Sequence, residues 1–275
     1  MINPFPFRQV GDFHITALSD GTINASLELL SGIENADADA IQYRAGIDKP
    51  GDIHINCYLI RGRGRVMLVD AGPGAPGHLM ANLAALGVRP DDVDTVLLTH
   101  CHPDHIGGLL DAEKEPVFKC AEIILHPLEA QYWRDDKKRE MANERGQRNF
   151  LLVRQTLNVY APNIRFFNGG KIAEEILPVF LPGHTPGHTG FRIDSGNERL
   201  LIWGDIVHYP HIQSAQPAVS ILFDVDPAQA GETRKKIMEQ AVSEKLLIAG
   251  MHLNQAGFAR VHRDGSTYRI FYSDE

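Results

Sequence analysis

The sequence is poor in cysteine and in long apolar runs, and each shortage excludes a class of protein. Cysteine occurs three times, as Cys57, Cys101 and Cys120, and this odd number with wide spacing does not suggest a disulfide framework. No apolar run reaches the roughly 18 residues that a membrane helix needs, so no membrane partner is expected. The N-terminal stretch lacks the basic and apolar segments of a signal peptide. Since free thiols fit a reducing compartment, we expect a cytoplasmic protein.

Positive charge is also scarce, because 27 Lys and Arg are outnumbered by 35 Asp and Glu, for a net charge of −8. Without a basic excess or a long basic stretch, no nucleic-acid partner is expected. The chain also lacks the Gly-x-Ser-x-Gly turn of serine hydrolases. What remains is an ordinary globular composition, 43% hydrophobic over 275 residues. We expect residues 1–275 to form a single domain.

Short apolar runs alternate with helical patterns along the chain, which predicts a layered α/β fold. Residues 55–72 predict two strands joined by a glycine-rich hairpin at 62–64. Residues 226–245 predict a helix with Asp226 as its N-cap. The highly charged segment 134–149 predicts either a solvated helix or a mobile lid. Strands buried on both faces are expected within 96–98, 121–126 and 246–253.

The stretch LLTHCHPDHIGG, residues 97–108, concentrates ligand-type side chains. Alternate residues of an extended chain point to the same side, so His100 and His102 face one way and Cys101 faces the other. Imidazole and carboxylate groups together suit zinc and related divalent metals. Three histidines and one aspartate within six residues are hard to attribute to chance. The stretch therefore predicts a metal site with the candidate ligands His100, His102, Asp104 and His105.

Three more candidate ligands follow apolar strands elsewhere in the chain. His184 lies in the turn LPGHTPGHTG, Asp205 ends LLIWGD, and His252 ends LLIAGMH. Strand ends of layered α/β folds commonly meet in one cleft, and a buried carboxylate needs a partner. We therefore expect these side chains to join the first group, whereas His188 and His126 are expected to have structural roles.

In order and spacing, these residues resemble the metallo-β-lactamase fold superfamily over nearly the whole chain. The resemblance implies a four-layer αβ/βα sandwich with a metal cleft along one edge of the sheets. It also implies two divalent metal ions, zinc in the first place, with manganese, cobalt or iron compatible. The first metal would be held by His100, His102 and His184. The second would be held by Asp104, His105 and His252, with Asp205 bridging the two.

The implied activity is that of a dinuclear metal-dependent hydrolase that uses a metal-bridging hydroxide. Asp205 and Asp104 are the expected catalytic carboxylates, with Asp205 handling a proton. The segments ALSDGT, THCHPDHIGGL, LEAQYW and GHTPGHT resemble in more detail the branch of methyl parathion hydrolase and its lactonase or arylesterase relatives. That branch implies a small ester, lactone or phosphotriester as the substrate.

The resemblance also suggests a substrate pocket. Trp133 and Phe150 would line it, unless both are simply core aromatics. The loop PGAPGH is short and lacks the aromatic residue that methyl parathion hydrolase carries there. Quorum-signal lactonases place a tyrosine three residues after the bridging aspartate, where this chain has His208, followed by Tyr209. Either side chain could donate a hydrogen bond to a developing oxyanion, and surface roles are the alternative.

Three alternatives remain at this stage. The chain could be a lactonase for acyl-homoserine signals, or a mononuclear iron enzyme similar to the persulfide dioxygenases. It could also be a binding protein stabilised by metal, although a structural zinc site usually closes with four ligands. A small-molecule substrate is expected in the first two cases. Relatives of the branch are often dimers, which suggests a homodimer here.

Overall fold

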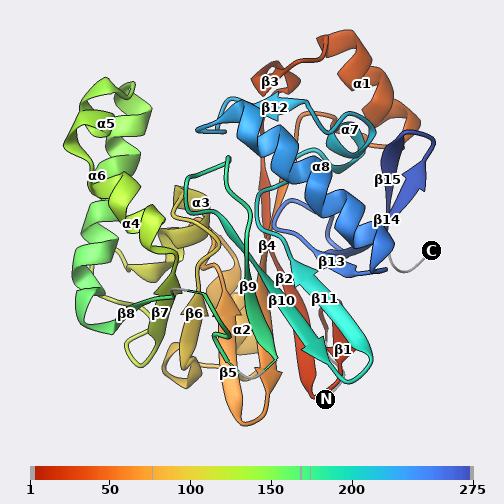
Figure 1. Cartoon of the computed structure of the whole chain (residues 1–275). Helices are drawn as coiled ribbons and strands as arrows, with labels where there is room; N and C mark the ends of the chain where they lie inside the picture. The colour runs from red at the N-terminus through yellow and green to blue at the C-terminus, as the bar shows by residue number, and fades with distance from the viewer. Residues whose placement is uncertain (1–3, 76, 168, 174, 273–275) are drawn as a thin grey trace.

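The computed structural model describes residues 4–75, 77–167, 169–173 and 175–272. Two β-sheets lie face to face, and helices cover their outer faces (Figure 1). A third, two-stranded sheet joins β3 (Leu30–Ser31) to β12 (Ser220–Ile221). The predicted layered α/β fold is thus confirmed.

The first sheet contains seven strands in the order β1-β2-β4-β5-β6-β7-β8. Its first pairs are antiparallel, and β5 to β8 run parallel. The predicted hairpin joins β4 to β5, and its turn residues Arg63 and Gly64 both have positive φ, 52° and 75°, as two-residue hairpin turns favour. The strands are β1 (Phe7–Val10), β2 (Phe13–Ile23), β4 (Ile53–Gly62), β5 (Arg65–Val69), β6 (Thr95–Leu97), β7 (Glu122–Leu125) and β8 (Ile164–Phe166).

The second sheet contains six strands in the order β15-β14-β13-β11-β10-β9. All its pairs are antiparallel except β11 with β13. The strands are β9 (Ile176–Phe180), β10 (Thr189–Ser195), β11 (Glu198–Ile202), β13 (Leu247–Ala249), β14 (Phe258–Asp264) and β15 (Thr267–Tyr272).

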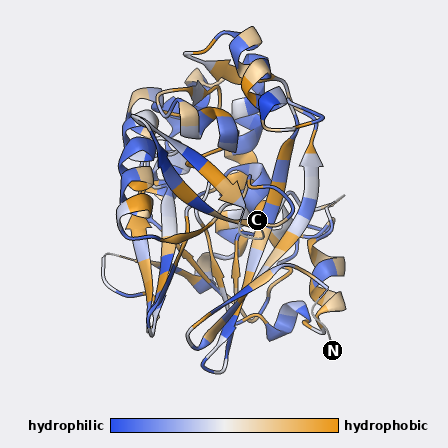
Figure 2. Ribbon diagram, turned by 90° about the vertical axis from the view of Figure 1, so that its right-hand side faces the viewer, coloured by the Kyte–Doolittle hydropathy of each residue, from blue (hydrophilic) through white to orange (hydrophobic). Residues whose placement is uncertain are grey.

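Three apolar cores hold the layers together. The central core lies between the sheets, where Ile15 and Val69 of the first pack in one cluster with Phe191 and Ile202 of the second. A second core joins the first sheet to α2, α4 and α6, and a third joins the second sheet to α8. Apolar stretches run along the strands of both sheets where they face each other (Figure 2). Buried on both faces, β6 and β7 need the unbroken apolar sequence that predicted them.

The helices flank these sheets, and some of them cover one end of the molecule (Figure 1). Helix α8 begins after Asp226, whose side chain accepts from the backbone N–H of Gln229 at 3.0 Å, as predicted. The charged segment 134–149 forms α5 and the first turns of α6. The helices are α1 (Asn35–Arg44), α2 (Leu79–Ala85), α3 (Pro103–Ile106), α4 (Pro127–Arg134), α5 (Asp136–Met141), α6 (Glu144–Val159), α7 (Pro210–Ala215) and α8 (Pro227–Ser243). Short 3-10 turns occur at Leu27–Leu29, Pro90–Asp92, Gly107–Leu109 and Ala161–Asn163. In the described ranges, each helix is too short or too polar to cross a membrane.

Glycines let the metal-motif loop pack closely on the neighbouring strand end. A Cβ on Gly108 would lie 2.1 Å from the carbonyl oxygen of Ala71, and one on Gly107 would lie 2.2 Å from that of Pro73. Side chains of any size are therefore excluded at both positions. The contact brings the segment after β5 against α3, so the ends of β5 and β6 meet where the candidate ligands lie.

Candidate metal centre

Three histidines from two distant segments converge after β6 and β9. His100 follows β6, His102 precedes α3, and His184 lies in the loop between β9 and β10. Nδ1 of His102 lies 3.0 Å from Nε2 of His100 and 2.9 Å from Nε2 of His184. The other ring nitrogens of His100 and His184 are occupied, since Nδ1 of His100 bonds the Thr99 hydroxyl and Nδ1 of His184 donates to Asp224. Three ring nitrogens are thus left facing one another, an arrangement suited to a cation.

A second group lies beside the first and contains two carboxylates. Nε2 of His105 and of His252 lie 3.1 Å and 2.8 Å from Oδ2 of Asp205. Asp104 completes the group, with its Oδ2 3.6 Å from Nε2 of His105. Nδ1 of His252 donates to the carbonyl of His54 at 2.7 Å, which fixes the ring and leaves Nε2 facing the carboxylates. These ligand atoms all lie within 4.8 Å of one another.

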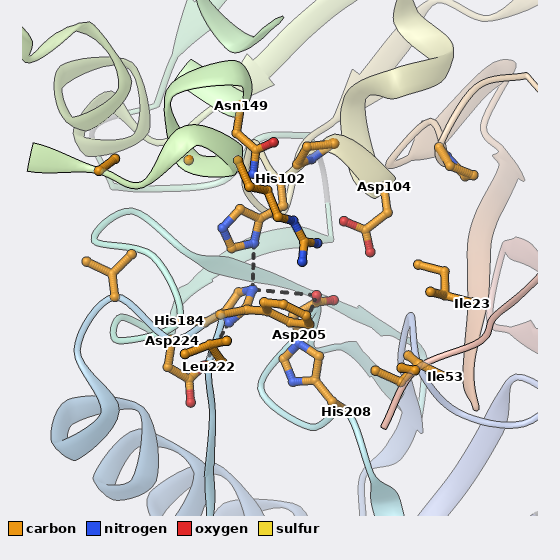
Figure 3. A pocket seen from close by; sticks show the side chains of 18 of the residues that line it. Ile23, Ile53, His102, Asp104, Asn149, His184, Asp205, His208, Leu222 and Asp224 are labelled. Atoms are coloured by element: carbon orange, nitrogen blue, oxygen red, sulfur yellow. Dashed lines mark hydrogen bonds and ion pairs between the residues drawn. The ribbon is translucent and has the colours of Figure 1, made fainter. Parts of the chain in front are cut away.

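Asp205 stands between the two groups. Besides its contacts to the second group, its Oδ2 lies 3.8 Å from Nε2 of His100 and 3.6 Å from Nε2 of His184. Its Oδ1 is buried without a hydrogen-bond partner among the described residues. His188 holds this loop, because its Nε2 accepts from the Asp205 backbone N–H at 2.9 Å. Figure 3 shows His102, His184, Asp205 and His208 pointing toward a common centre, with Asp104 to one side.

Burial and neighbouring charges shift the pKa values of the candidate ligands in both directions. Burial and neighbouring imidazoles lower the pKa of His100 and of His102, so both rings are neutral. Burial would raise the pKa of Asp205, but the surrounding histidines lower it, so this carboxylate is ionised. His105 and His252 differ, because their neighbouring carboxylates outweigh burial and raise the pKa of each ring. Neutral imidazoles and ionised carboxylates are the binding forms, so metal binding at His105 would release a proton. The residues present therefore fit a pair of divalent cations.

Buried carboxylates that the sequence analysis did not identify orient these ligands. Asp70 accepts from Nδ1 of His105 at 2.6 Å and from the backbone N–H and hydroxyl of Thr99 at 2.8 and 2.7 Å. Asp224 accepts from Nδ1 of His184 at 2.8 Å. Such partners set the tautomer and direction of a ligating ring. Asp70 ends the apolar run of β5, a signal that could have identified it, whereas Asp224 lies in a loop with no comparable signal.

A cavity of about 530 Å³ opens above the cluster. His102, Asp104, His184, Asp205, His208 and His252 line its floor. Apolar side chains from separate parts of the chain, including Ile23, Ile53 and Leu222, line the sides (Figure 3). The cavity thus combines a polar floor with apolar walls, as small-molecule sites commonly do.

Trp133 and Phe150 line this cavity and belong to the core at the same time. Only 3% and 2% of their surfaces are exposed, and their ring centres lie 4.8 Å apart. The Trp133 ring centre lies 5.7 Å from that of His102. These aromatics therefore pack in the core and form a wall beside the candidate metal ligands, and their contact with a substrate stays a prediction.

His208 and Tyr209 face opposite ways, and the structure separates the two candidates. His208 lines the cavity with Nε2 3.3 Å from Oδ2 of Asp205, and its buried Nδ1 has no partner among the described residues. Burial lowers the pKa of His208 to about 4, so the ring is neutral. Tyr209 is 1% exposed, is absent from the cavity lining, and donates its hydroxyl to the carbonyl of Gly51 at 2.9 Å. The predicted contact of Tyr209 with substrate is therefore wrong, because its side chain packs into the core behind the site.

Comparisons with known proteins agree with this geometry. A family model described as "Metallo-beta-lactamase superfamily" matches residues 50–252. Among curated proteins, the chain is 24% identical over 152 residues to the uncharacterised protein YobT of Bacillus subtilis (strain 168), covering 55% of this chain and 62% of that protein. It is also 38% identical over 85 residues to the probable metallo-hydrolase YqjP of the same organism, covering 30% of this chain and 24% of that protein. The chain thus spans less than two thirds of these curated relatives.

Two solved structures are similar over almost their full length. One is described as the hydrolase AbOPH in the beta lactamase superfamily, with a TM-score of 0.89, 29% identity and coverage of 98% of both chains. The other is AidC, described as a dizinc quorum-quenching lactonase, with a TM-score of 0.91, 26% identity and coverage of 97% of this chain and 96% of that one.

Proposed function

Because the chain belongs to the metallo-beta-lactamase superfamily, we propose that it is a dinuclear metal-dependent hydrolase of a small ester, lactone or phosphotriester. The single observation that carries this proposal is the position of Asp205. One buried carboxylate faces both groups of candidate ligands, and this position supports a bridging role. A structural zinc site, which usually closes with four ligands, would not need this arrangement.

Each metal would be held by side chains that already converge. His100, His102 and His184 would hold the first metal, and Asp104, His105 and His252 the second, with Asp205 shared. When bound, two such cations lower the pKa of a water and polarise the carbonyl or phosphoryl oxygen of the substrate. Zinc is the proposed metal, supported by the imidazole-rich ligand set and by the dizinc description of AidC.

The remaining residues would bind and orient the substrate. The neutral ring of His208 would donate a hydrogen bond to the oxygen on which charge develops. Trp133 and Phe150 would contact an aryl or acyl group along the wall of the cavity. Asp205 and Asp104 would handle protons on the floor, where Oδ1 of Asp205 has no partner among the described residues.

The first experiment compares kcat/KM on aryl esters, acyl-homoserine lactones, simple aliphatic lactones and an aryl phosphotriester, with the bound metal measured in the same preparation. We expect two divalent metal ions per chain and hydrolysis of at least one class. One iron per chain with thiol-dependent oxygen uptake would instead support the dioxygenase alternative. Because AidC is described as a lactonase, lactones form the class in which we expect the fastest turnover.

Asp205→Asn tests the bridging role directly. We expect turnover to fall by about two orders of magnitude, with loss of bound metal, while the chain stays folded. Asp91→Asn is the matched control, because Asp91 is exposed and remote from the cavity. Near-normal turnover of the Asp205 variant would contradict the proposal.

Location and assembly belong to the same proposal. We propose a cytoplasmic protein, supported by three cysteines that are all free thiols. We also propose that it acts on a small molecule without a nucleic-acid or membrane partner, and that it forms a homodimer. Light scattering of the purified protein tests the last point.

A further inference from the structure

A basic side chain, Arg145, lies in the lining of the cavity. It belongs to the first turn of α6, and the neighbouring residues Asn143, Gly146 and Asn149 also line the cavity. In the part of the chain that the structure describes, no other lysine or arginine lines it. This is notable in a chain of net charge −8, because a cation placed in a small-molecule cavity suggests an anionic group on the ligand.

Arg145 reaches across the cavity to the opposite side. Its Cζ lies 4.9 Å from the ring centre of Phe223, which follows β12 and also lines the cavity. In Figure 1, α6 and β12 lie on opposite sides of α3. A guanidinium stacked on an aromatic face keeps its N–H edge available for hydrogen bonds. The contact therefore orients Arg145 without occupying its donors.

No carboxylate neutralises Arg145 among the described residues. Its chain neighbour Glu144 is 96% exposed and lies 3.9 Å from Nη1 of Arg148 on the next turn. The three carboxylates that line the cavity have other partners. Asp104 and Asp205 belong to the candidate metal centre, where bound cations would compensate their charge, and Asp224 pairs with His184 and Arg234 at 2.8 and 3.7 Å. The positive charge of Arg145 is thus available to a ligand.

The cavity that Arg145 lines also contains exposed apolar side chains. Leu222 and Val225 line the cavity near Phe223 and are 73% and 40% exposed, and Ile23 on the other side is 41% exposed. Large apolar side chains left in solvent at the mouth of a pocket indicate contact with an apolar ligand group. An apolar wall with one cation matches a molecule that has a hydrocarbon part and a single anionic group.

We propose that Arg145 binds a carboxylate of the substrate remote from the scissile bond, so that the substrate is an ester or lactone whose hydrocarbon chain carries a carboxylate. The planar guanidinium binds a carboxylate through two parallel hydrogen bonds. The hydrocarbon chain would lie between Leu222 and Ile23, and the ester would reach the floor. This inference rests on the proposed hydrolase function.

The test uses a matched pair of substrates, 4-nitrophenyl hemiadipate and its neutral methyl ester, with uncatalysed hydrolysis subtracted for each. The metal-loaded wild-type protein is expected to prefer the hemiadipate in kcat/KM. In Arg145→Gln the ratio of the two kcat/KM values should fall about tenfold or more, mainly through a higher KM for the hemiadipate. Arg148→Gln, on the same helix, is the matched control and should leave the ratio unchanged.

Charge reversal gives a second readout. Arg145→Glu should shift the preference toward an aryl ester that carries a trimethylammonium group at the same position. A wild-type preference for the methyl ester, or an equal loss on both esters in Arg145→Gln, would overturn the proposal. Absence of hydrolysis of both esters by the wild type, together with inactivity on the wider substrate panel, would instead contradict the hydrolase function itself.

Discussion

Glu129 of α4 is a buried carboxylate that ties together the two loops carrying the first group of candidate ligands. One oxygen accepts from the backbone N–H of Cys101 at 3.1 Å and from the indole N–H of Trp133 at 3.0 Å. The other accepts from the hydroxyl of Thr185 and from the backbone N–H of Gly187 at 2.9 Å. Burial raises the pKa of Glu129, and these donors counteract the shift. All four lone-pair directions of the carboxylate are thus in use.

Replacing Glu129 by Gln should destabilise the fold, because an amide group would then face two donors. A hydrogen bond to a charged group contributes about 1.5–3 kcal/mol, and an unsatisfied buried donor costs about 1–3 kcal/mol. Removing a buried charge returns part of its desolvation cost. We therefore expect a net loss of about 2–4 kcal/mol, which corresponds to about 3–7 °C in Tm for a chain of this size.

The assay for Glu129→Gln is urea unfolding of the metal-free protein, followed by titration with zinc. Because Glu129 positions the loops of His102 and His184, zinc affinity should also fall by about 10- to 100-fold. Glu122→Gln is the control, since Glu122 is half-exposed and pairs with Arg165 at 2.8 Å, a contact worth at most about 1 kcal/mol. A stability within 1 kcal/mol of wild type and unchanged zinc affinity would refute the reasoning.

Two further predictions concern the second candidate donor and the pH dependence of stability. His208→Gln should lower kcat about tenfold or more with the bound metal unchanged. Tyr209→Phe should keep normal turnover and lose about 1 kcal/mol of stability, because it lacks the hydrogen bond to Gly51. The reverse pattern would show that Tyr209, and not His208, acts on the substrate. Burial raises the pKa of Asp94, but the Thr95 hydroxyl, the Val66 N–H and Arg65 outweigh it and lower this pKa. The stabilisation from Asp94 is therefore present above its unfolded pKa of about 3.9 and is lost as the pH falls through the lower folded pKa. Asp94→Asn should destabilise the metal-free protein at pH 6 by less than about 1 kcal/mol, because the side chain is half-exposed. The difference in stability between wild type and variant should shrink between about pH 4 and 2. A constant difference over that range would contradict the lowered pKa of Asp94.

The candidate ligands could be predicted because the sequence places four of them within six residues. His100 to His105 follow a short apolar strand, so their proximity did not depend on any long-range contact. The fold was predictable for a similar reason, since β6 and β7 show unbroken apolar runs and the β4–β5 hairpin has its own turn signal. In each of these cases the residues that predict the feature lie within a few positions of it in the sequence.

Neighbouring positions in the turn between β11 and α7 were harder to separate. His208 and Tyr209 follow Asp205 closely, yet His208 lines the cavity and Tyr209 packs away from it. The sequence contains both a polar ring and a phenol at adjacent positions but does not show which side faces the cavity. The packing of Tyr209 against the segment near Gly51 decides this, and that segment lies more than 150 residues away in the chain.

The supporting carboxylates were missed because their partners are distant in the sequence. Asp70 lies 35 residues from His105, Asp224 lies 40 residues from His184, and Glu129 lies 56 residues from Thr185. Each is an isolated acidic residue with no local pattern, and each becomes part of the site only because buried N–H groups require acceptors. Folding and metal binding therefore depend on the same hydrogen bonds. A substitution at one of these carboxylates should weaken both together, whereas a substitution at Arg145 should change the choice of substrate alone.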